Sequence, residues 1–132
     1  MTPDGTALRE ELAEAAADAP EGGRKDDDKK PRFDLLSYLA MRGTAEVLRF
    51  GAQKYAAHNW RKGIAWSRLI GAALRHLTAF MDGEDLDPES GLPHVDHLAC
   101  CVMFLQEHYH RRRDLDDRFK VRVSISGGPD GK

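Results

Sequence analysis

The sequence predicts an all-α domain followed by one short strand. Apolar residues recur at three- and four-residue spacing in segments 34–57, 66–81 and 93–105, which is the period of an amphipathic helix. Only residues 119–125 alternate apolar and polar side chains, as a half-buried strand does. At 132 residues the chain is long enough for one hydrophobic core and too short for two.

The N-terminal part of the chain is predicted to be a flexible arm. Its charged run at 24–30 has no apolar face to bury. Glu11 and Glu14 make a literal E-x-x-E, which we interpret as chance because no pattern places it beside the other acidic residues. We therefore expect three parts, which are an arm at 1–31, a helical domain at 32–118, and a short strand with a disordered tail at 119–132.

The first helical segment is expected to begin at Asp34, a suitable N-cap. Gly43 and Thr44 are expected to divide or kink it. Beyond that point the helical period places Glu46 on an inward stripe, with Lys54 beside it.

The connection at 57–65 is rich in glycine, asparagine and charge, yet it contains Trp60. Two interpretations stay open. The indole is either a hydrophobic plug under the loop or a wall of a nucleoside pocket on which a base stacks. In the second case Asn59 would read the edge of the base.

Residues 66–81 give the clearest helix, because their apolar side chains form a broad stripe. His76 lies on this stripe, where a histidine is more often a satisfied core residue than a functional one. Arg75 lies one step around the helix, where a guanidinium is suited to a phosphate or a carboxylate. Gly83 is a suitable residue to end the helix.

Residues 82–97 hold four aspartates, two glutamates and two histidines. Carboxylates repel one another, so gathering them is unfavourable unless a cation offsets their charge. Oxygen-rich clusters hold Mg²⁺ or Mn²⁺, and imidazole favours Mn²⁺ or a softer metal over Ca²⁺. The alternative interpretation is an acidic surface loop between helices.

Pro93 is expected to open the third helix, with His94 and His97 on one face. Residues 98–105 are apolar almost all round, which predicts a central helix in a bundle or a helix at a subunit interface. The strand at 119–125 needs a partner, and the same segment of a second subunit would provide one. The strand therefore predicts an oligomer, and the subunit-interface interpretation of the apolar helix agrees with it.

If the helices pack antiparallel, the acidic stretch meets the ends of its neighbouring helices. Carboxylates and imidazoles would then converge from Glu46, Glu84, Asp87, Glu89, His76, His94 and His97. Cations for phosphate oxygens would come from Lys54, Arg61, Lys62 and Arg75. Such a set favours metal-assisted attack of water on a phosphoanhydride, with a carboxylate as general base.

Composition and motifs argue against several other classes. The formal net charge of −2, from 20 basic and 22 acidic residues, disfavours general nucleic-acid binding. No apolar run approaches the roughly 18 residues of a membrane span, and no signal peptide or P-loop is apparent. Cys100 and Cys101 fit reduced core residues. We expect a soluble cytoplasmic protein that binds neither nucleic acid nor membrane.

Several motifs agree together in order and spacing with a known family. They are Lys30-Pro-Arg-Phe-Asp-Leu-Leu, Phe50-Gly-Ala-Gln-Lys-Tyr, Asn59-Trp-Arg-Lys-Gly, Trp66-Ser-Arg-Leu, Ala73-Leu-Arg-His-Leu, and Gly83 to His97 with its Glu-Ser-Gly-Leu-Pro-His. From about residue 29 to 108 the chain resembles the phage-type dATP/dGTP diphosphohydrolases, which are MazG-like all-α nucleotide pyrophosphohydrolases and include the MazZ-type enzymes.

The resemblance implies a MazG-like helical bundle, assembled as a homodimer or homotetramer, that uses two or more Mg²⁺ or Mn²⁺ ions. It implies hydrolysis of a purine deoxynucleoside triphosphate, dGTP or dATP with dGTP favoured, to the monophosphate and pyrophosphate. In a phage this activity would supply dGMP for 2-aminoadenine DNA synthesis. Residues 32–118 would be the catalytic domain.

The sequence departs from the wider MazG pattern, in which E-x-x-E and E-x-x-D on successive helices bind metal. His94-Val-Asp-His97 stands at the E-x-x-D position, and the helix at 66–81 has no E-x-x-E. The expected metal ligands are first Glu46, Glu84, Glu89 and His97, then Asp82, Asp87, His94 and Asp96. The expected catalytic residues are Glu46, Glu89 and Lys54. The expected substrate-binding residues are Lys54, Tyr55, Asn59, Trp60, Lys62, Arg75 and His76.

Two other functions compete with this one. An HD-type phosphohydrolase, which releases nucleoside and triphosphate, needs an adjacent His-Asp pair, and the chain offers Asp96-His97 in reversed order. A helical interaction protein with an acidic docking loop would leave Trp60, Asn59 and Lys62 unexplained.

Overall fold

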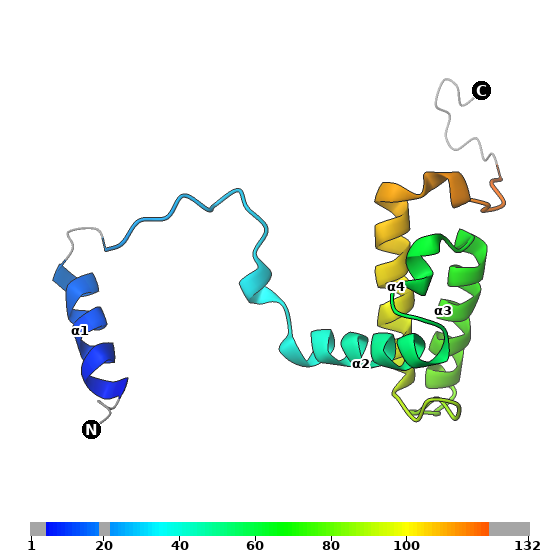
Figure 1. The fold of residues 1–132 in the computed structure, drawn as a ribbon, viewed down its shortest axis with the longest axis horizontal. Coiled ribbons are helices and arrows are strands. Elements are labelled where there is room, and N and C mark those ends of the chain that lie inside the picture. The colour runs from blue at the N-terminus through cyan, green and yellow to red at the C-terminus, as the bar shows by residue number, and fades with distance from the viewer. Residues whose placement is uncertain (1–4, 19–21, 122–132) are drawn as a thin grey trace, which may run out of the picture. The chain divides into compact units, whose positions relative to one another are not determined.

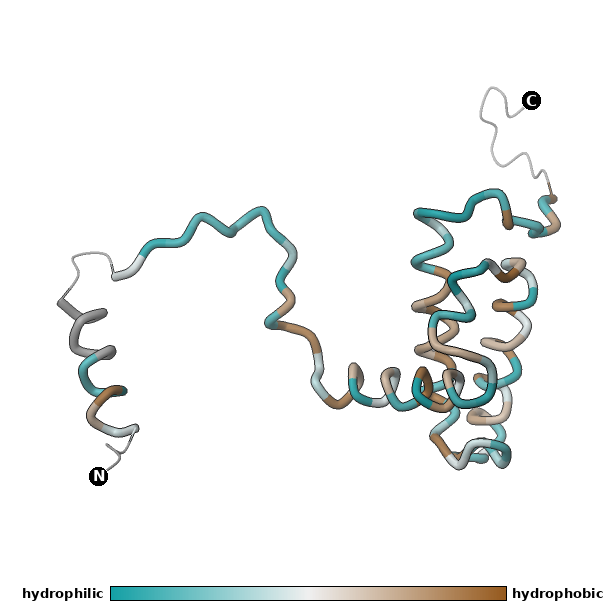
Figure 2. The backbone as a smooth tube through the Cα atoms, in the orientation of Figure 1, coloured by the Kyte–Doolittle hydropathy of each residue, from teal (hydrophilic) through white to brown (hydrophobic). Residues whose placement is uncertain are grey.

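The computed structural model describes residues 5–18 and 22–121, and the chain divides into two units, residues 1–35 and 36–132. In the first unit, α1 (Gly5–Asp18) contains the E-x-x-E of the arm, and a short 3-10 helix, η1, spans Phe33–Leu35. The stretch at 24–30 between them is hydrophilic (Figure 2). The flexibility of the arm stays a prediction.

Within its described residues, 36–121, the second unit contains three α-helices and two 3-10 helices, and its all-α class is confirmed. The helices are α2 (Tyr38–Lys54), α3 (Trp66–Met81) and α4 (His94–Arg111), and the 3-10 helices are η2 (Asn59–Lys62) and η3 (Arg113–Leu115). α3 and α4 run side by side and α2 crosses them (Figure 1). Because α4 packs on both other helices, it occupies the central position that its apolar sequence predicted.

The predicted C-terminal strand falls mostly on residues that the structure does not describe. Residues 119–121 are described and have no strand pairing. The rest of the segment, 122–132, lies outside the described residues. A MazG-like arrangement of the helices also stays a prediction.

The start of α2 differs from the prediction. Ser37, not Asp34, caps the helix, because its Oγ accepts a hydrogen bond from the Ala40 N–H at 3.1 Å. Asp34 lies in η1 and pairs with Arg32 at 2.8 Å. The Ser37 hydroxyl is three residues before Ala40 and can accept a hydrogen bond from its free N–H. Asp34 lies too far before this amide in the chain to contact it.

The expected break at Gly43 is also wrong, since α2 runs through this residue without interruption. The glycine has another role there. A Cβ at Gly43 would collide with the Asp96 carboxylate of α4, so the missing side chain leaves room for that carboxylate between the two helices.

The bounds predicted for α3 are confirmed at both ends. The helix spans Trp66–Met81, and Gly83 follows it with a φ of 98°, a conformation that glycine adopts without strain. Its N-terminus is capped from a distance, because Asp117 accepts hydrogen bonds from the Ser67 N–H at 2.8 Å and the Ser67 hydroxyl at 2.6 Å. α4 begins at His94, one residue after Pro93.

The apolar core is small and is formed by all three helices. Its buried members are Val47, Trp66, Leu69, Cys100 and Cys101. Both cysteines are free and buried, as predicted, and burial raises the pKa of the Cys100 thiol to about 12. None of the helices in the described part of the chain is long and apolar enough to cross a membrane.

Candidate functional site

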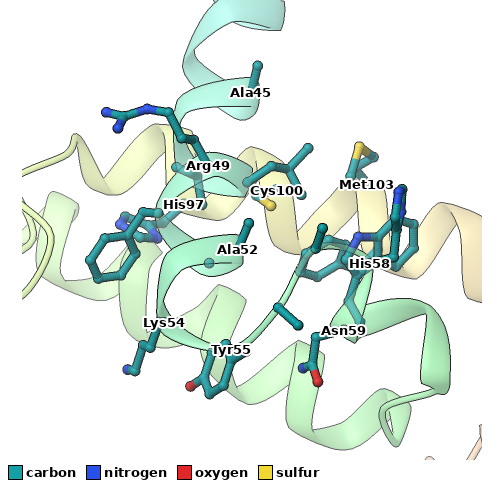
Figure 3. A pocket seen from close by; sticks show the side chains of 18 of the residues that line it. Ala45, Arg49, Ala52, Lys54, Tyr55, His58, Asn59, His97, Cys100 and Met103 are labelled. Carbon is teal, nitrogen blue, oxygen red and sulfur yellow. The ribbon is translucent and has the colours of Figure 1, made fainter.

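A cavity of about 640 Å³ lies between α2, η2 and α4 (Figure 3). Along α4 its lining residues follow one face of the helix, and they are His97, Cys100, Met103, Phe104 and Glu107. A helical rise of about 1.5 Å per residue separates His97 from Glu107 by roughly 15 Å. The cavity therefore has two distinct ends, one lined by imidazoles and carboxylates and the other by aromatic side chains.

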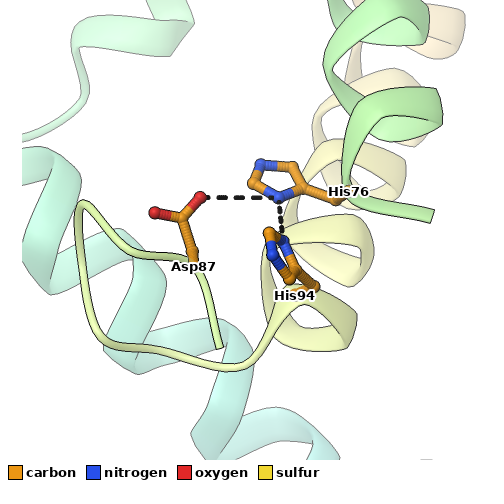
Figure 4. Close-up of side chains that lie close together, drawn as sticks. All are labelled: His76, Asp87 and His94. Carbon is orange, nitrogen blue, oxygen red and sulfur yellow. Dashed lines mark hydrogen bonds and ion pairs between the residues drawn. The ribbon is translucent and has the colours of Figure 1, made fainter. Parts of the chain in front are cut away.

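Three potential metal ligands from three elements meet at the polar end. They are His76 of α3, Asp87 of the loop at 82–93, and His94 at the start of α4 (Figure 4). Their ligand atoms all lie within 4.8 Å of one another. His76 Nδ1 is 2.9 Å from His94 Nδ1 and 3.8 Å from Asp87 Oδ2. Two imidazole nitrogens at this distance must share a proton or direct both lone pairs at one cation.

Glu84 orients His94 from behind the cavity. Its Oε1 lies 2.6 Å from His94 Nε2, and His94 itself is buried. When the carboxylate accepts the Nε2–H, a neutral His94 keeps its Nδ1 lone pair directed at His76. A carboxylate that fixes the tautomer of an imidazole in this way is the usual partner of a metal-ligating histidine.

The loop at 82–93 is fixed by its own backbone, so Asp87 is held in place. An isolated bridge joins Leu86 to Pro93. Asp87 Oδ1 accepts hydrogen bonds from the Glu89 N–H at 2.7 Å and the Ser90 N–H at 3.1 Å. Burial acts to raise the pKa of Asp87, but the two amides together with the nearby His97 and His76 hold the pKa below its ordinary value. Asp87 therefore presents an ionised carboxylate to His76.

His76 and His97 stack on each other with ring centroids 4.5 Å apart. Burial lowers the pKa of both imidazoles below the ordinary value of 6.5. Neutral rings can bind a metal ion, whereas protonated rings cannot. His97 Nε2 also lies 2.7 Å from the Ser90 Oγ, which ties the loop to α4.

An ion pair stands at the mouth of the cavity. Lys54, at the end of α2, places its Nζ 2.6 Å from Glu89 Oε2. The hydrogen bond to Glu89 raises the pKa of the lysine, so the ammonium stays charged. Figure 3 shows Lys54 and Tyr55 next to each other at this end of α2.

The other end of the cavity is built around Trp60. Its ring stacks on Phe104 with centroids 4.6 Å apart, and the Arg61 guanidinium lies 4.4 Å from its centre. Buried His108 supports the arrangement, because its Nε2 accepts from the Ile64 N–H at 3.1 Å while its Nδ1 donates to the Phe104 carbonyl at 2.8 Å. Trp60 thus packs against Phe104 and also lines the cavity.

The donors at the polar end suit a divalent transition metal. Two imidazoles and one carboxylate favour Mn²⁺, Fe²⁺ or Zn²⁺, whereas Mg²⁺ prefers oxygen ligands alone. The Nδ1 atoms of His76 and His94 face each other, so two neutral rings that both carry a lone pair there would suit such an ion. The ionised carboxylate of Asp87 suits it as well.

The family model described as the N-terminal part of dATP/dGTP diphosphohydrolases matches residues 20–118. The chain belongs to this family. Over 96 residues it is 35% identical to a dATP/dGTP diphosphohydrolase of Salmonella phage PMBT28, a match that covers 73% of this chain and 33% of the relative. The chain therefore spans about a third of the length of that relative. No solved structure matches it.

The family match contains every site residue that the sequence predicted, and the structure gathers most of them. Those that line the cavity are Lys54, Tyr55, Asn59, Trp60, His76, Asp87, Glu89 and His97. Glu84 and His94 lie directly against this group.

Five predicted site residues lie elsewhere. Glu46 pairs with Arg49 of its own helix at 3.0 Å, and Asp96 faces Gly43. Arg75 and Asp82 line a smaller hollow on α3, and Lys62 is exposed. The remaining members of that hollow are Leu74, Thr78 and Ala79.

Sequence reasoning missed Ser90, Phe104, Glu107 and His108. Phe104 and Glu107 follow His97 at seven and ten residues, so the helical period alone places them on its face. Glu107 begins a strongly charged run, residues 107–117, whose composition is typical of a solvated helix end. The hydrogen-bond partners of His108 lie up to 44 residues away in the chain, and no local sequence pattern predicts them.

Proposed function

We propose that this chain forms the nucleotide site of a diphosphohydrolase. The substrate would be a purine deoxynucleoside triphosphate, dGTP or dATP with dGTP favoured, and the products would be the monophosphate and pyrophosphate. One observation supports this most strongly. A single cavity has a cation-binding group at one end and a stacking aromatic group at the other. The family relative from Salmonella phage PMBT28 is named for the same two nucleotides.

In this proposal His76, Asp87 and His94 hold a divalent cation, Mn²⁺ in preference to Mg²⁺, and Glu84 orients His94. The cation supplies Lewis-acid stabilisation of the charge that develops on phosphoryl oxygens. Glu89 and His97 line the same end of the cavity and are candidates for holding a second ion.

The chain's own side chains would perform the remaining steps. Lys54 leaves Glu89 and neutralises phosphate oxygens at the mouth. The freed Glu89 carboxylate accepts a proton from the attacking water. The water oxygen bonds to a phosphorus beside the α–β bridging oxygen, and the bond from that phosphorus to the bridging oxygen breaks. Trp60 holds the base by stacking.

We also propose that the chain assembles as a homodimer or homotetramer. Large apolar side chains in the second unit remain open to solvent, including Tyr38 at 71%, Leu39 at 75%, Leu74 at 56% and Met81 at 74%. Apolar side chains of this size would be removed from water at a contact with a second copy of the chain. Light scattering that gives the mass of one chain at all concentrations would contradict an oligomer.

The test of the activity is a product assay with each dNTP and NTP in Mn²⁺ or Mg²⁺. Monophosphate and pyrophosphate from dGTP or dATP would support the proposal, and in a phage the dGMP would feed 2-aminoadenine nucleotide synthesis. Nucleoside and triphosphate would indicate HD-type chemistry, which also uses histidine and aspartate ligands. No metal-dependent product from any nucleotide would favour an interaction protein.

A further inference from the structure

We propose that the Glu107 carboxylate recognises the Watson–Crick edge of guanine at the aromatic end of the cavity, and that this residue makes the chain select guanine over adenine. The inference rests on the proposed nucleotide site, because it assigns the base to the end of the cavity that lies opposite the cation-binding group.

The Glu107 carboxylate pairs with Arg111 at 2.8 Å and also faces the cavity, where it suits a ligand group that donates hydrogen bonds. It lines the cavity one turn beyond Phe104, with 31% of its side chain exposed. A carboxylate lowers the affinity of a site for a polyanion, so it is unfavourable near a triphosphate unless it contacts hydrogen-bond donors. Because Glu107 lies roughly 15 Å along α4 from His97, it is remote from the phosphates and close to the base.

Arg61 already makes the two contacts that a guanine would make. Its guanidinium lies 4.4 Å from the centre of the Trp60 ring, and its Nη1 lies 3.6 Å from Glu107 Oε2. The N1–C2–N2 fragment of guanine is itself a planar guanidine-like group with adjacent N–H donors. The side chain of Arg61 thus occupies a place suited to guanine in shape and in hydrogen bonding.

Displacement of Arg61 by the base is physically reasonable. Half of its side chain is exposed, at 51%, so the guanidinium can turn toward solvent or toward the substrate phosphates. Guanine would then stack on Trp60 and donate its N1–H and N2–H to the two oxygens of Glu107.

The chemistry of the bases makes this contact selective. Guanine alone carries two adjacent donors on its Watson–Crick edge. Adenine presents an acceptor at N1, which a carboxylate repels, beside the donor at N6. A site that hydrogen-bonds one base in this way disfavours a base that leaves the carboxylate unpaired.

The experiment measures binding of dGMP, dIMP and dAMP to the full chain by calorimetry, alongside turnover of dGTP, dITP and dATP. Hypoxanthine keeps N1–H and lacks the N2 amino group, so dIMP isolates one hydrogen bond. We expect dGMP to bind at least about tenfold more tightly than dIMP, and dAMP to bind more weakly than dIMP. Glu107→Gln should reduce dGMP affinity about a hundredfold and leave dAMP affinity unchanged or improved.

Arg111→Gln is the matched control. It removes the closest ionic partner of Glu107, at 2.8 Å, and leaves the carboxylate in place. This variant should keep the guanine preference. If it loses the preference as Glu107→Gln does, Glu107 acts only through helix packing and the proposal is overturned. If Glu107→Gln does not fold, Glu107→Asp replaces it and should retain the preference for guanine with weaker binding.

The outcomes separate this inference from the proposed function. An unchanged ratio of dGMP to dAMP affinity in Glu107→Gln, in a chain that hydrolyses dNTPs, overturns the inference alone. Binding of dGMP that depends on Glu107 without any hydrolysis supports the inference and overturns the proposed activity. Failure to bind any of the three monophosphates overturns the inference, and the turnover assay then decides the proposed activity.

Discussion

His76 and His94 face each other Nδ1 to Nδ1 at 2.9 Å, although they belong to different helices. The loop that joins α3 to α4 folds back on itself and brings the two rings together with Asp87. This contact joins α3 to the acidic stretch at 82–97, and it places two imidazole nitrogens where one metal ion could bind both.

Glu84→Gln is expected to weaken Mn²⁺ binding about 10- to 100-fold, because an amide no longer fixes the tautomer of His94. Calorimetric titration of the chain with Mn²⁺ measures the effect. Asp85→Asn is the control, since this neighbouring carboxylate is exposed and lies outside the group. Equal losses in the two variants would indicate a general effect of loop charge.

Glu89→Gln is expected to reduce kcat by about 100-fold or more with little change in KM, because the amide cannot accept a proton from water. Steady-state kinetics with dGTP and Mn²⁺ provide the measurement. Asp114→Asn, which alters a remote exposed ion pair, should retain full activity. A rise in KM alone would mean that Glu89 acts only by holding Lys54 at the mouth.

Trp60→Ala should raise KM more than it lowers kcat, because stacking on a base contributes about 1–3 kcal/mol. A KM increase of about 30-fold corresponds to the middle of this range. Trp60→Phe keeps an aromatic face toward the cavity and should recover most of the affinity. An unchanged KM in the alanine variant would assign Trp60 to packing against Phe104 alone.

Gly43→Ala should destabilise the second unit by about 1–3 kcal/mol in urea unfolding, because its Cβ collides with the Asp96 carboxylate. The intrinsic helix preference of alanine over glycine, about 1 kcal/mol, acts in the opposite direction. In an Asp96→Ala background the collision is gone, so Gly43→Ala should become stabilising. If it remains destabilising there, the backbone of α4 and not the carboxylate limits the approach.

Asp96→Ala by itself should keep Mn²⁺ binding, since Asp96 faces α2.

The metal-free chain is expected to lose stability as the pH falls below about neutrality. The pKa values of His76 and His97 are lowered in the folded chain, while the unfolded chain takes up protons near the ordinary value of 6.5. Below that pH the unfolded state binds more protons, so the free energy of unfolding decreases until the folded rings also protonate. Urea titrations between pH 5 and 8, in buffer that contains a metal chelator, measure how the free energy of unfolding changes around the ordinary pKa of histidine. A His97→Asn variant should show a shallower slope, and an unchanged slope would assign the dependence to other groups.

Sequence patterns predicted the helices well, because the side chains that define a helix face lie only three or four residues apart in the chain. Apolar spacing located α3 from Trp66 to Met81, and the glycine after it adopts the expected positive φ. The N-cap of α2 was assigned three residues too early, because aspartate and serine compete for that role and only geometry decides between them.

The sequence predicted which kinds of side chain form the site, but it predicted less well which individual residues belong to it. The acidic stretch and His94 and His97 were found from sequence alone, and they do converge with His76. Glu46 was placed inward by helical spacing, yet Arg49 three residues later offers it a partner on the surface. The contacts of Ser67 with Asp117 and of Ile64 with His108 join residues 50 and 44 positions apart, and a sequence pattern carries no information about such pairs.

The ion pair between Lys54 and Glu89 also governs how nucleotide association responds to ionic strength. Without substrate, the two charges largely cancel each other's field at the mouth of the cavity. Added salt screens the attraction of a triphosphate to Lys54, but it also weakens the pair that the triphosphate must break. Because these effects oppose each other, the association rate changes less with salt than it would at a mouth that held the lysine alone.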